Sequence, residues 1–290
     1  MRRVLPLLAT LLGACVTPPV SRGGRLAAVD DHGDTVVLAR PASRVVSLSP
    51  ATTELLFALG AGDRVVGRTH WCDYPAAALA VPDLGDGLTP NLEAVLGVHP
   101  DLVLLYPSAR NLQAVARLHA AGIPTLQLAT DRLADVSRLA RLLGPLVDRA
   151  AAGDSLGNQL ERQLAALDLP PLPAPPRVFL LAWADPPVTI GAGSFLNDIV
   201  TRAGGVNIFA DLPAPSGPVS IELVTQRDPD LILTTAADLP GFMQRPEWQA
   251  VRAVRLRRLV SLPGSAFERP SPRAVAAIQQ LAAALRQAGS

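Results

Sequence analysis

The segment from residue 131 to residue 168 interrupts a chain that otherwise alternates strand-type and helix-type sequence. Its Leu, Ala and Val residues recur at three- and four-residue spacings, which predicts helix nearly throughout. It leads into PPLPAPP (170–176), which cannot continue a helix because proline lacks the backbone N–H donor. Strand-type RVFLLAW (177–183) then restarts the alternation. The chain is therefore predicted to form two α/β lobes joined by one long helix.

Four stretches before that helix fit one α/β lobe. RVVSLSP (44–50) is typical of a buried strand, and ATTELLFALGAG (51–62) of a helix that begins at a threonine and ends at a glycine. RVVG (64–67) is the next strand, and NLEAVLGVHPDLVLLY (91–106) adds a helix and a further strand. Strands and helices separated by short Gly or Pro breaks indicate a largely parallel sheet.

The same alternation follows residue 176 and closes with a helix over residues 271–288. The predicted segments are a lipoprotein signal peptide (1–14), a lipid tether with an N-terminal hairpin (15–43), an N-terminal lobe (44–145), a connecting helix (146–170) and a C-terminal lobe (171–290).

The N-terminus predicts export. Two arginines precede an apolar run over residues 4–12, about half the length that spans a bilayer as a helix. Small residues in LGAC (12–15) precede Cys15, as at a cleavage site. This resembles a bacterial lipobox, which implies lipid attachment to Cys15; the alternative is a plain secretory signal with an incidental cysteine. We expect an exported protein at the periplasmic face or cell surface, lipid-anchored through the tether VTPPVSRGG (16–24). DDHGD (30–34), between two short apolar runs, predicts a hairpin.

Charge and motifs weigh against two classes of function. Lys and Arg number 26 against 25 Asp and Glu, which leaves no basic excess for a nucleic-acid partner. The sequence has no Gly-rich phosphate loop and no G-x-S-x-G elbow, and no carboxylate–histidine cluster has usable spacing. We therefore expect no enzyme, and an exported α/β enzyme is the less favoured alternative.

A phrase from the first half returns in the second. NLEAVLGVHPDLVLL (91–105) matches SIELVTQRDPDLILT (220–234), so Glu93 and Glu222 each lie two residues after a capping residue, and each precedes a Pro-Asp-Leu step by the same interval. A carboxylate in a first helical turn is favoured by the free N–H groups there. The repeat predicts two equivalent lobes, and by itself leaves the glutamates as ordinary helix-start residues.

Several phrases together resemble a known family: RVVSLSPATTELLFALGAGDRVVG, HWCDYP, NLEAVLGVHPDLVLLY, GGVNIF, SIELV and FERPSPR. The chain resembles the cobalamin-binding members of the helical-backbone substrate-binding proteins of ABC importers, which are related to iron-siderophore and haem binding proteins. The resemblance implies two Rossmann-like lobes joined by a single long α-helix and a corrinoid held between them as transported ligand, with no cofactor and no chemistry. It also implies a monomer that docks on an ABC permease dimer through Glu93 and Glu222.

The resemblance places ligand-binding residues in loops that follow strands, where open α/β sheets bind ligands. Aromatic side chains there suit a flat macrocycle because they offer rigid contact area. The expected ligand-binding residues are Pro50, Ala51, Thr52, Trp71, Tyr74, Tyr106, Trp183, Ser265, Ala266, Phe267, Glu268 and Arg269.

Departures from the family pattern leave the ligand open. Gly87 and Ser216-Gly217 stand where the enteric cobalamin binder has tryptophans, and Ser265-Ala266 replaces an acidic-tryptophan pair. The C-lobe disulfide of that protein is also missing. A haem or ferric-siderophore binder on the same scaffold is therefore the alternative function. No closed metal site is expected, because His70 and Cys72 supply two of the four ligands that zinc needs; either is an option as an axial ligand to a bound metal.

Overall fold

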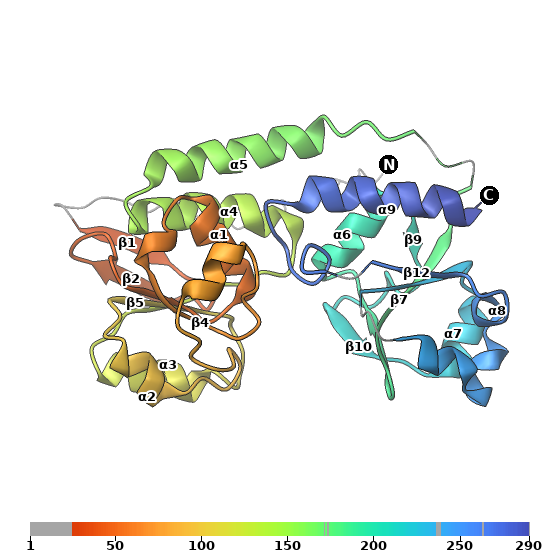
Figure 1. Ribbon diagram of the computed structural model, residues 1–290, viewed down its shortest axis with the longest axis horizontal. Coiled ribbons are helices and arrows are strands. Elements are labelled where there is room, and N and C mark those ends of the chain that lie inside the picture. Colours follow the sequence, from red (N-terminus) through yellow and green to blue (C-terminus); the bar gives the residue numbers. More distant parts are fainter. Residues whose placement is uncertain (1–24, 171, 173, 236–238, 263, 290) are drawn as a thin grey trace, which may run out of the picture.

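The computed structural model describes residues 25–289 except 171, 173, 236–238 and 263, and these form two lobes side by side (Figure 1). The predicted signal peptide, Cys15 and residues 16–24 of the predicted tether lie outside the described residues. The chain leaves the N-terminal lobe through helix α5 (Ala150–Ala165), which runs along one side of the molecule. No helix among the described residues is long and apolar enough to cross a membrane.

The N-terminal lobe is built on a parallel sheet with the strand order β4-β3-β5-β6. Its strands are β3 (Val45–Ser47), β4 (Val65–Arg68), β5 (Leu102–Leu105) and β6 (Thr125–Gln127). Its helices are α1 (Pro50–Ala58), α2 (Leu92–Gly97), α3 (Leu112–Ala120) and α4 (Leu133–Leu146), with 3-10 turns at Gly62–Arg64 and Ala76–Ala80.

Side chains alternate across this sheet. Leu102 and Leu104 pack in one cluster with residues of α1 and α4, whereas Val103 and Leu105 pack in another with residues of α2 and α3. Helices therefore cover both faces, which explains why β5 is apolar at every position rather than at every second one.

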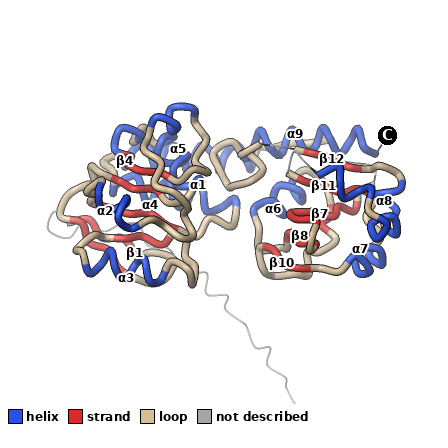
Figure 2. The backbone as a smooth tube through the Cα atoms, turned by 60° about the horizontal axis from the view of Figure 1, so that its bottom comes forward, coloured by secondary structure: helices blue, strands red, loops and turns tan. Residues whose placement is uncertain are grey.

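The C-terminal lobe repeats that order with an addition. Its parallel strands run β9-β7-β11-β12, as β4-β3-β5-β6 do, and β8 and β10 add an antiparallel extension (Figure 2). The strands are β7 (Arg177–Ala184), β8 (Pro187–Ile190), β9 (Val206–Asn207), β10 (Ser216–Pro218), β11 (Leu231–Thr234) and β12 (Leu259–Ser261). The helices are α6 (Phe195–Arg202), α7 (Ile221–Arg227), α8 (Arg252–Arg255) and α9 (Ala274–Gly289), with 3-10 turns at Leu239–Gln244 and Pro246–Ala250.

The predicted hairpin is present. β1 (Leu26–Val29) pairs antiparallel with β2 (Thr35–Leu38) across the expected turn. The turn lies against the end of β6, because Asp31 donates its N–H to the carbonyl of Gln127 at 2.9 Å.

The predicted helix over 131–168 is divided into two helices, α4 and α5. The chain turns at residues 147–149, where Asp148 has a φ of 56°. Close contact between the two helices needs glycine, since a Cβ on Gly153 would lie 2.4 Å from the carbonyl oxygen of Ala140. The expectation of a single helix over 131–168 is wrong at residues 147–149, because periodicity records the apolar face of each helix and not the turn between them. Helix α5 lies within the predicted connecting helix over 146–170.

The two repeated segments, residues 91–105 and 220–234, form equivalent hydrogen bonds in the two lobes. The Asp101 carboxylate accepts from the N–H of Arg44 at 2.9 Å, and the Asp230 carboxylate accepts from the N–H of Arg177 at 2.9 Å. Arg44 immediately precedes β3 and Arg177 begins β7. Each donates its guanidinium to a carbonyl at the end of the Glu-bearing helix: Arg44 to Val98 and Arg177 to Arg227.

The turn that follows each Glu-bearing helix is also shared. His99 and Asp228 both adopt positive φ, at 46° and 41°, and both precede the proline of the Pro-Asp-Leu step. Both lobes thus have the same strand order, a residue with positive φ after the Glu-bearing helix, and an aspartate that accepts the backbone N–H of an arginine. The lobes are therefore pseudo-equivalent in three dimensions and not only in sequence.

We expect Asp101→Ala to lower the free energy of unfolding by about 1–2 kcal/mol, since its carboxylate accepts from the backbone N–H groups of both Ser43 and Arg44. Chemical denaturation measures the change. Asp63→Ala, at an exposed acidic residue of the same lobe, is the matched control. Equal stability of the two variants would contradict the bracing role of Asp101.

Candidate functional site

A hollow of about 370 Å³ lies between the lobes and is lined from both sides. Pro50, His70, Trp71 and Asp73 come from the N-terminal lobe, and Glu268 and Arg269 from the C-terminal lobe. These segments follow β3, β4 and β12, so the hollow lies beyond the carboxyl ends of parallel strands.

Two larger hollows lie elsewhere on the described chain. One of about 650 Å³ is lined only by C-lobe residues near α8, and one of about 880 Å³ lies between α4, α5 and α6. Neither is lined by the loops that follow parallel strands of both lobes. We therefore take the smaller interlobe hollow as the candidate site.

The loop 69–75 presents an aromatic surface to this hollow. The Trp71 side chain is 64% exposed, and its ring lies 4.7 Å from the imidazole of His70, centroid to centroid. The loop is anchored by Cys72, whose sulfur contacts the hydroxyls of Thr53 and Thr69 at 3.1 and 3.2 Å.

Cys72 is itself 0% exposed, so a ligand in the hollow cannot reach its sulfur, and the axial-ligand option does not hold for this residue. His70 lines the hollow and keeps that option. No three His, Cys, Asp or Glu side chains are grouped to hold a metal ion among the residues that the structure describes.

Arg269 connects the lobes and is only 7% exposed. Its guanidinium donates to the carbonyl oxygen of Trp71 at 2.8 Å and to the carboxylate of Asp73. The C-terminal lobe therefore holds the aromatic loop of the N-terminal lobe from across the cleft.

A second arginine makes the deeper contact between the lobes. Arg273 pairs with both carboxylate oxygens of Glu54 on α1 at 2.7 Å, and its guanidinium lies 3.8 Å from the centre of the Tyr74 ring. Burial lowers the pKa of Arg273, but Glu54 outweighs it and the net shift is upward. The same guanidinium donates to the hydroxyl of Ser265 at 3.1 Å.

Sequence reasoning missed Glu54, Asp73 and Arg273. The available signal was local: Glu54 is the one acidic residue in a helix of otherwise apolar and hydroxyl side chains, and it is 2% exposed. A buried acid of this kind requires a partner. The sequence did not say which arginine that partner is.

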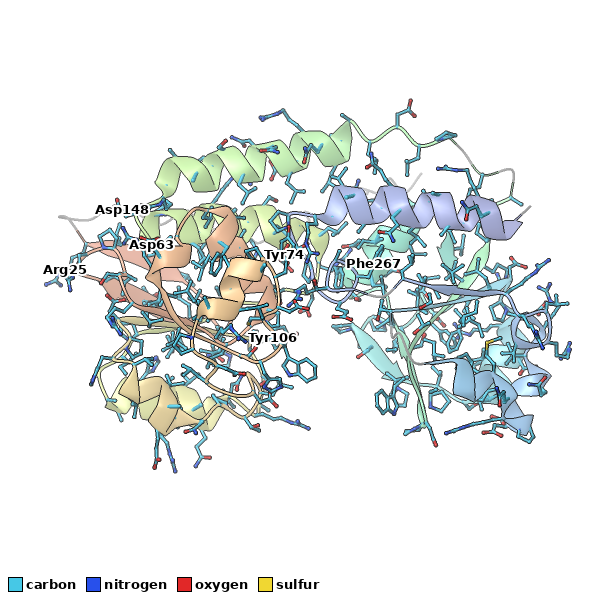
Figure 3. The ribbon with its side chains drawn as sticks, in the orientation of Figure 1. Arg25, Asp63, Tyr74, Tyr106, Asp148 and Phe267 are labelled. Atoms are coloured by element: carbon cyan, nitrogen blue, oxygen red, sulfur yellow. The ribbon has the colours of Figure 1, made fainter. Side chains whose placement is uncertain are left out.

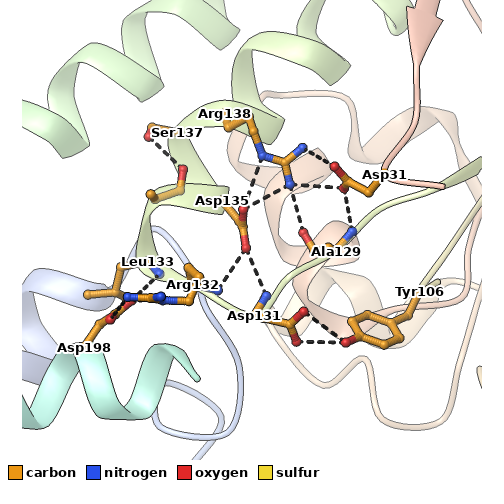
Figure 4. A network of polar contacts seen from close by, with 11 residues as sticks. Asp31, Tyr106, Ala129, Asp131, Arg132, Leu133, Asp135, Ser137, Arg138 and Asp198 are labelled. Atoms are coloured by element: carbon orange, nitrogen blue, oxygen red, sulfur yellow. Dashed lines mark hydrogen bonds and ion pairs between the residues drawn. The ribbon is translucent and has the colours of Figure 1, made fainter. Parts of the chain in front are cut away.

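Tyr106, which directly follows β5, is hydrogen-bonded to Asp131. Its hydroxyl donates to both carboxylate oxygens of Asp131, at 2.9 and 3.0 Å (Figure 4). Burial and the adjacent Asp131 carboxylate raise the pKa of Tyr106 to about 12. The phenol therefore stays protonated at neutral pH.

The same network reaches the other lobe. Arg132, next to Asp131, forms an ion pair with Asp198 on α6, with nitrogen–oxygen distances of 2.5 and 2.9 Å (Figure 4). Asp135 accepts from the N–H groups of both Asp131 and Arg132, which fixes the start of α4.

The remaining expected residues divide between surface and core. Trp183, the second-to-last residue of β7, is 63% exposed and donates its indole N–H to the carbonyl of Asp185. Thr52 is fully buried, and its hydroxyl contacts Ser47 within the N-terminal lobe.

Phe267 differs from expectation, because it packs in the C-lobe core and offers no face to a ligand (Figure 3). Ala266 packs against the same core. Ala51 is buried and lines a small separate cavity with Pro270, and it is not among the residues that line the hollow.

Glu93 and Glu222 are exposed in the first turns of α2 and α7. Asn91 and Ser220 cap these helices, accepting from the N–H groups of Ala94 and Leu223 at 3.2 Å. Hydrogen bonds from its own backbone N–H and from the Ser220 hydroxyl lower the pKa of Glu222.

The Tyr106 phenol is expected to titrate near pH 12, visible as phenolate absorbance. Tyr106→Phe should remove that step and leave only Tyr74, the other tyrosine of the chain. Because the folded pKa lies above the ordinary value of 10.0, the stability from this phenol is present below pH 10 and lost as pH rises towards 12. Titration of Tyr106 near pH 10 would contradict the Asp131 contact.

Known proteins share both sequence and architecture with this chain. The vitamin B12-binding protein of Vibrio cholerae is 30% identical over 249 residues, which cover 85% of this chain and 90% of that protein. The crystal structure of the periplasmic vitamin B12 binding protein BtuF of Vibrio cholerae matches with a TM-score of 0.67 and 28% identity, over 86% of this chain and 99% of that one. The periplasmic heme-binding protein RhuT of Roseiflexus sp. RS-1, in apo form, matches with a TM-score of 0.75 and 26% identity, over 86% of this chain and 100% of that one.

The sequence model of the periplasmic binding protein family matches residues 45–266. Binding proteins of this family work outside the cytoplasm and deliver a ligand to an ABC permease. The chain therefore belongs to the periplasmic binding protein family, whose members are substrate-binding proteins and not enzymes.

Proposed function

We propose that the protein captures cobalamin or a related corrinoid between its lobes and delivers it to an ABC importer. The observation that carries this proposal is the interlobe hollow, lined from both lobes and flanked by the exposed ring of Trp71. A flat, partly apolar macrocycle gains rigid contact area from such a ring. The relative that is 30% identical is a vitamin B12-binding protein.

Haem is the second candidate ligand, and the exposed imidazole of His70 in the hollow favours it. Tyr106 weighs against it as an iron ligand, because iron binds the phenolate and this phenol stays protonated and hydrogen-bonded to Asp131. The Arg273 guanidinium covers one face of the Tyr74 ring, 3.8 Å from its centre. The corrinoid remains the better proposal because it needs no protein ligand to its metal.

In this proposal the protein contacts the membrane through a lipid anchor and contacts the permease through two glutamates. Cys15 carries the lipid anchor after cleavage of residues 1–14, so the mature monomer stays at the periplasmic face or cell surface. Glu93 and Glu222 then dock on the two permease subunits. Their pseudo-equivalent positions, one exposed carboxylate in the first turn of a capped helix on each lobe, suit a two-fold partner.

Calorimetric titration with cyanocobalamin, dicyanocobinamide, haemin and a ferric hydroxamate tests the ligand. We expect heat with the two corrinoids, and an affinity about tenfold lower in Trp71→Ala, because aromatic contact contributes on the order of 1 kcal/mol or more. Leu79→Ala, at another exposed apolar side chain of the same lobe, is the control. No heat with either corrinoid would refute the proposal.

Docking is tested by Glu93→Ala combined with Glu222→Ala. Ligand affinity should stay at the wild-type value, because both residues lie outside the hollow, while uptake in cells should be abolished. Glu247→Ala, an exposed glutamate on the C-terminal lobe, should leave both unchanged. Uptake at the wild-type rate in the double variant would remove these two residues from the docking role.

A further inference from the structure

We propose that Asp73 and Glu268 determine the charge selectivity of the cleft: they favour ligands edged with carboxamides and disfavour ligands that carry free carboxylates. The inference rests on the proposed function, since it assigns selectivity to the same hollow. It concerns the chemical class of the ligand and not the act of transport.

Arg269 is the one arginine among the described residues that line the hollow, and both of its terminal nitrogens already donate hydrogen bonds. Arg269 donates to Trp71 and Asp73, and its Nε lies 4.0 Å from a Glu54 oxygen, buried and without a hydrogen-bond partner among the described residues. The guanidinium is thus turned towards acceptors of the N-terminal lobe. A ligand carboxylate would compete with Asp73 for the Nη2 nitrogen of this guanidinium.

The charges around the hollow leave an acidic excess. Arg273 is neutralised by Glu54 and covered by the Tyr74 ring, so its charge does not face the hollow. Asp73, whose side chain is half exposed, and the exposed Glu268 both line it. Glu268 forms no ion pair with any residue that the structure describes.

These carboxylates interact differently with a carboxamide edge and with a carboxylate edge of a ligand. A carboxamide can donate its N–H groups to the Asp73 and Glu268 carboxylates, which accept without being displaced. A free carboxylate has no proton to donate, and it meets the Glu268 carboxylate, which forms no ion pair with a described residue, and the Asp73 carboxylate, which already pairs with Arg269. Selectivity follows from repulsion of the wrong edge as well as attraction of the right one.

The test compares two corrinoids that share one ring: dicyanocobinamide, edged with carboxamides, and dicyanocobyrinic acid, edged with free carboxylates. Haemin, with two propionates, is a third probe. Asp73→Asn removes one charge at nearly constant shape and should raise affinity for cobyrinic acid and haemin about tenfold, the scale of one partly screened charge pair. Affinity for cobinamide should not rise, because an amide edge carries no charge to be relieved and asparagine is a weaker acceptor than aspartate. The ratio of the two affinities should therefore shift towards cobyrinic acid.

Glu268→Gln provides an independent variant at an exposed position, should Asp73→Asn not fold, and should shift selectivity in the same direction. Asp63→Asn, the exposed acid outside the hollow, is the charge-matched control and should shift nothing.

The salt dependence of affinity distinguishes a charge effect of Asp73 from a purely structural role, because a structural role would not make affinity depend on salt. In the wild-type protein, added salt should screen the repulsion and raise affinity for cobyrinic acid, and this dependence should weaken in Asp73→Asn. Weaker binding of both corrinoids by the same factor would mean that Asp73 only holds the Trp71 loop, and an unchanged ratio of the two affinities in both variants would also overturn the inference. If the wild-type protein binds neither corrinoid, the proposed function fails, while the haemin titrations of both variants still decide the charge effect.

Discussion

The ion pair between Glu54 and Arg273 is the contact on which the interlobe cleft depends. Glu54 lies on the first helix of the N-terminal lobe and Arg273 just before the last helix of the C-terminal lobe, yet the carboxylate is almost fully buried against the guanidinium. Such a pair adds little net stability, but loss of one partner leaves a buried charge unpaired, which typically costs about 3–5 kcal/mol. The pair therefore fixes one arrangement of the lobes, and the Tyr74 ring and the Arg269 contacts with the aromatic loop follow from it.

Two lobes with one internal plan account for much of the rest. Both sheets share a strand order, and in both an aspartate accepts the N–H of the arginine at the start of the first strand. This equivalence places an exposed glutamate at the start of a capped helix on each lobe. The lobes differ where the ligand is expected: the N-terminal lobe supplies the aromatic loop and the C-terminal lobe supplies the two arginines that hold it.

Local patterns in the sequence predicted the elements well and the contacts between them poorly. The N-lobe strands, the hairpin, the strand over 177–183 and the Glu-bearing helices could be predicted because alternation, turn residues and caps lie within a few residues of one another. The antiparallel strands β8 and β10 were not predicted. The turn at residues 147–149 was missed, since both helices around it carry the same apolar spacing. Phe267 was expected in the cleft but packs in the core, because an aromatic residue in a loop has the same local sequence signature in either place.

The sequence alone determined the fold class, the two equivalent lobes and the family, because these rest on periodicity, repeats and motifs that the chain carries in its own order. Only the tertiary structure decided which side chains meet across the cleft. Glu54 and Arg273 are 219 residues apart, and Asp73 and Arg269 are 196 apart. No local pattern specifies such pairs, since they form only after each lobe has folded and the lobes have packed together. The charge of the cleft, and with it the selectivity proposed here, is for that reason a property of the folded protein.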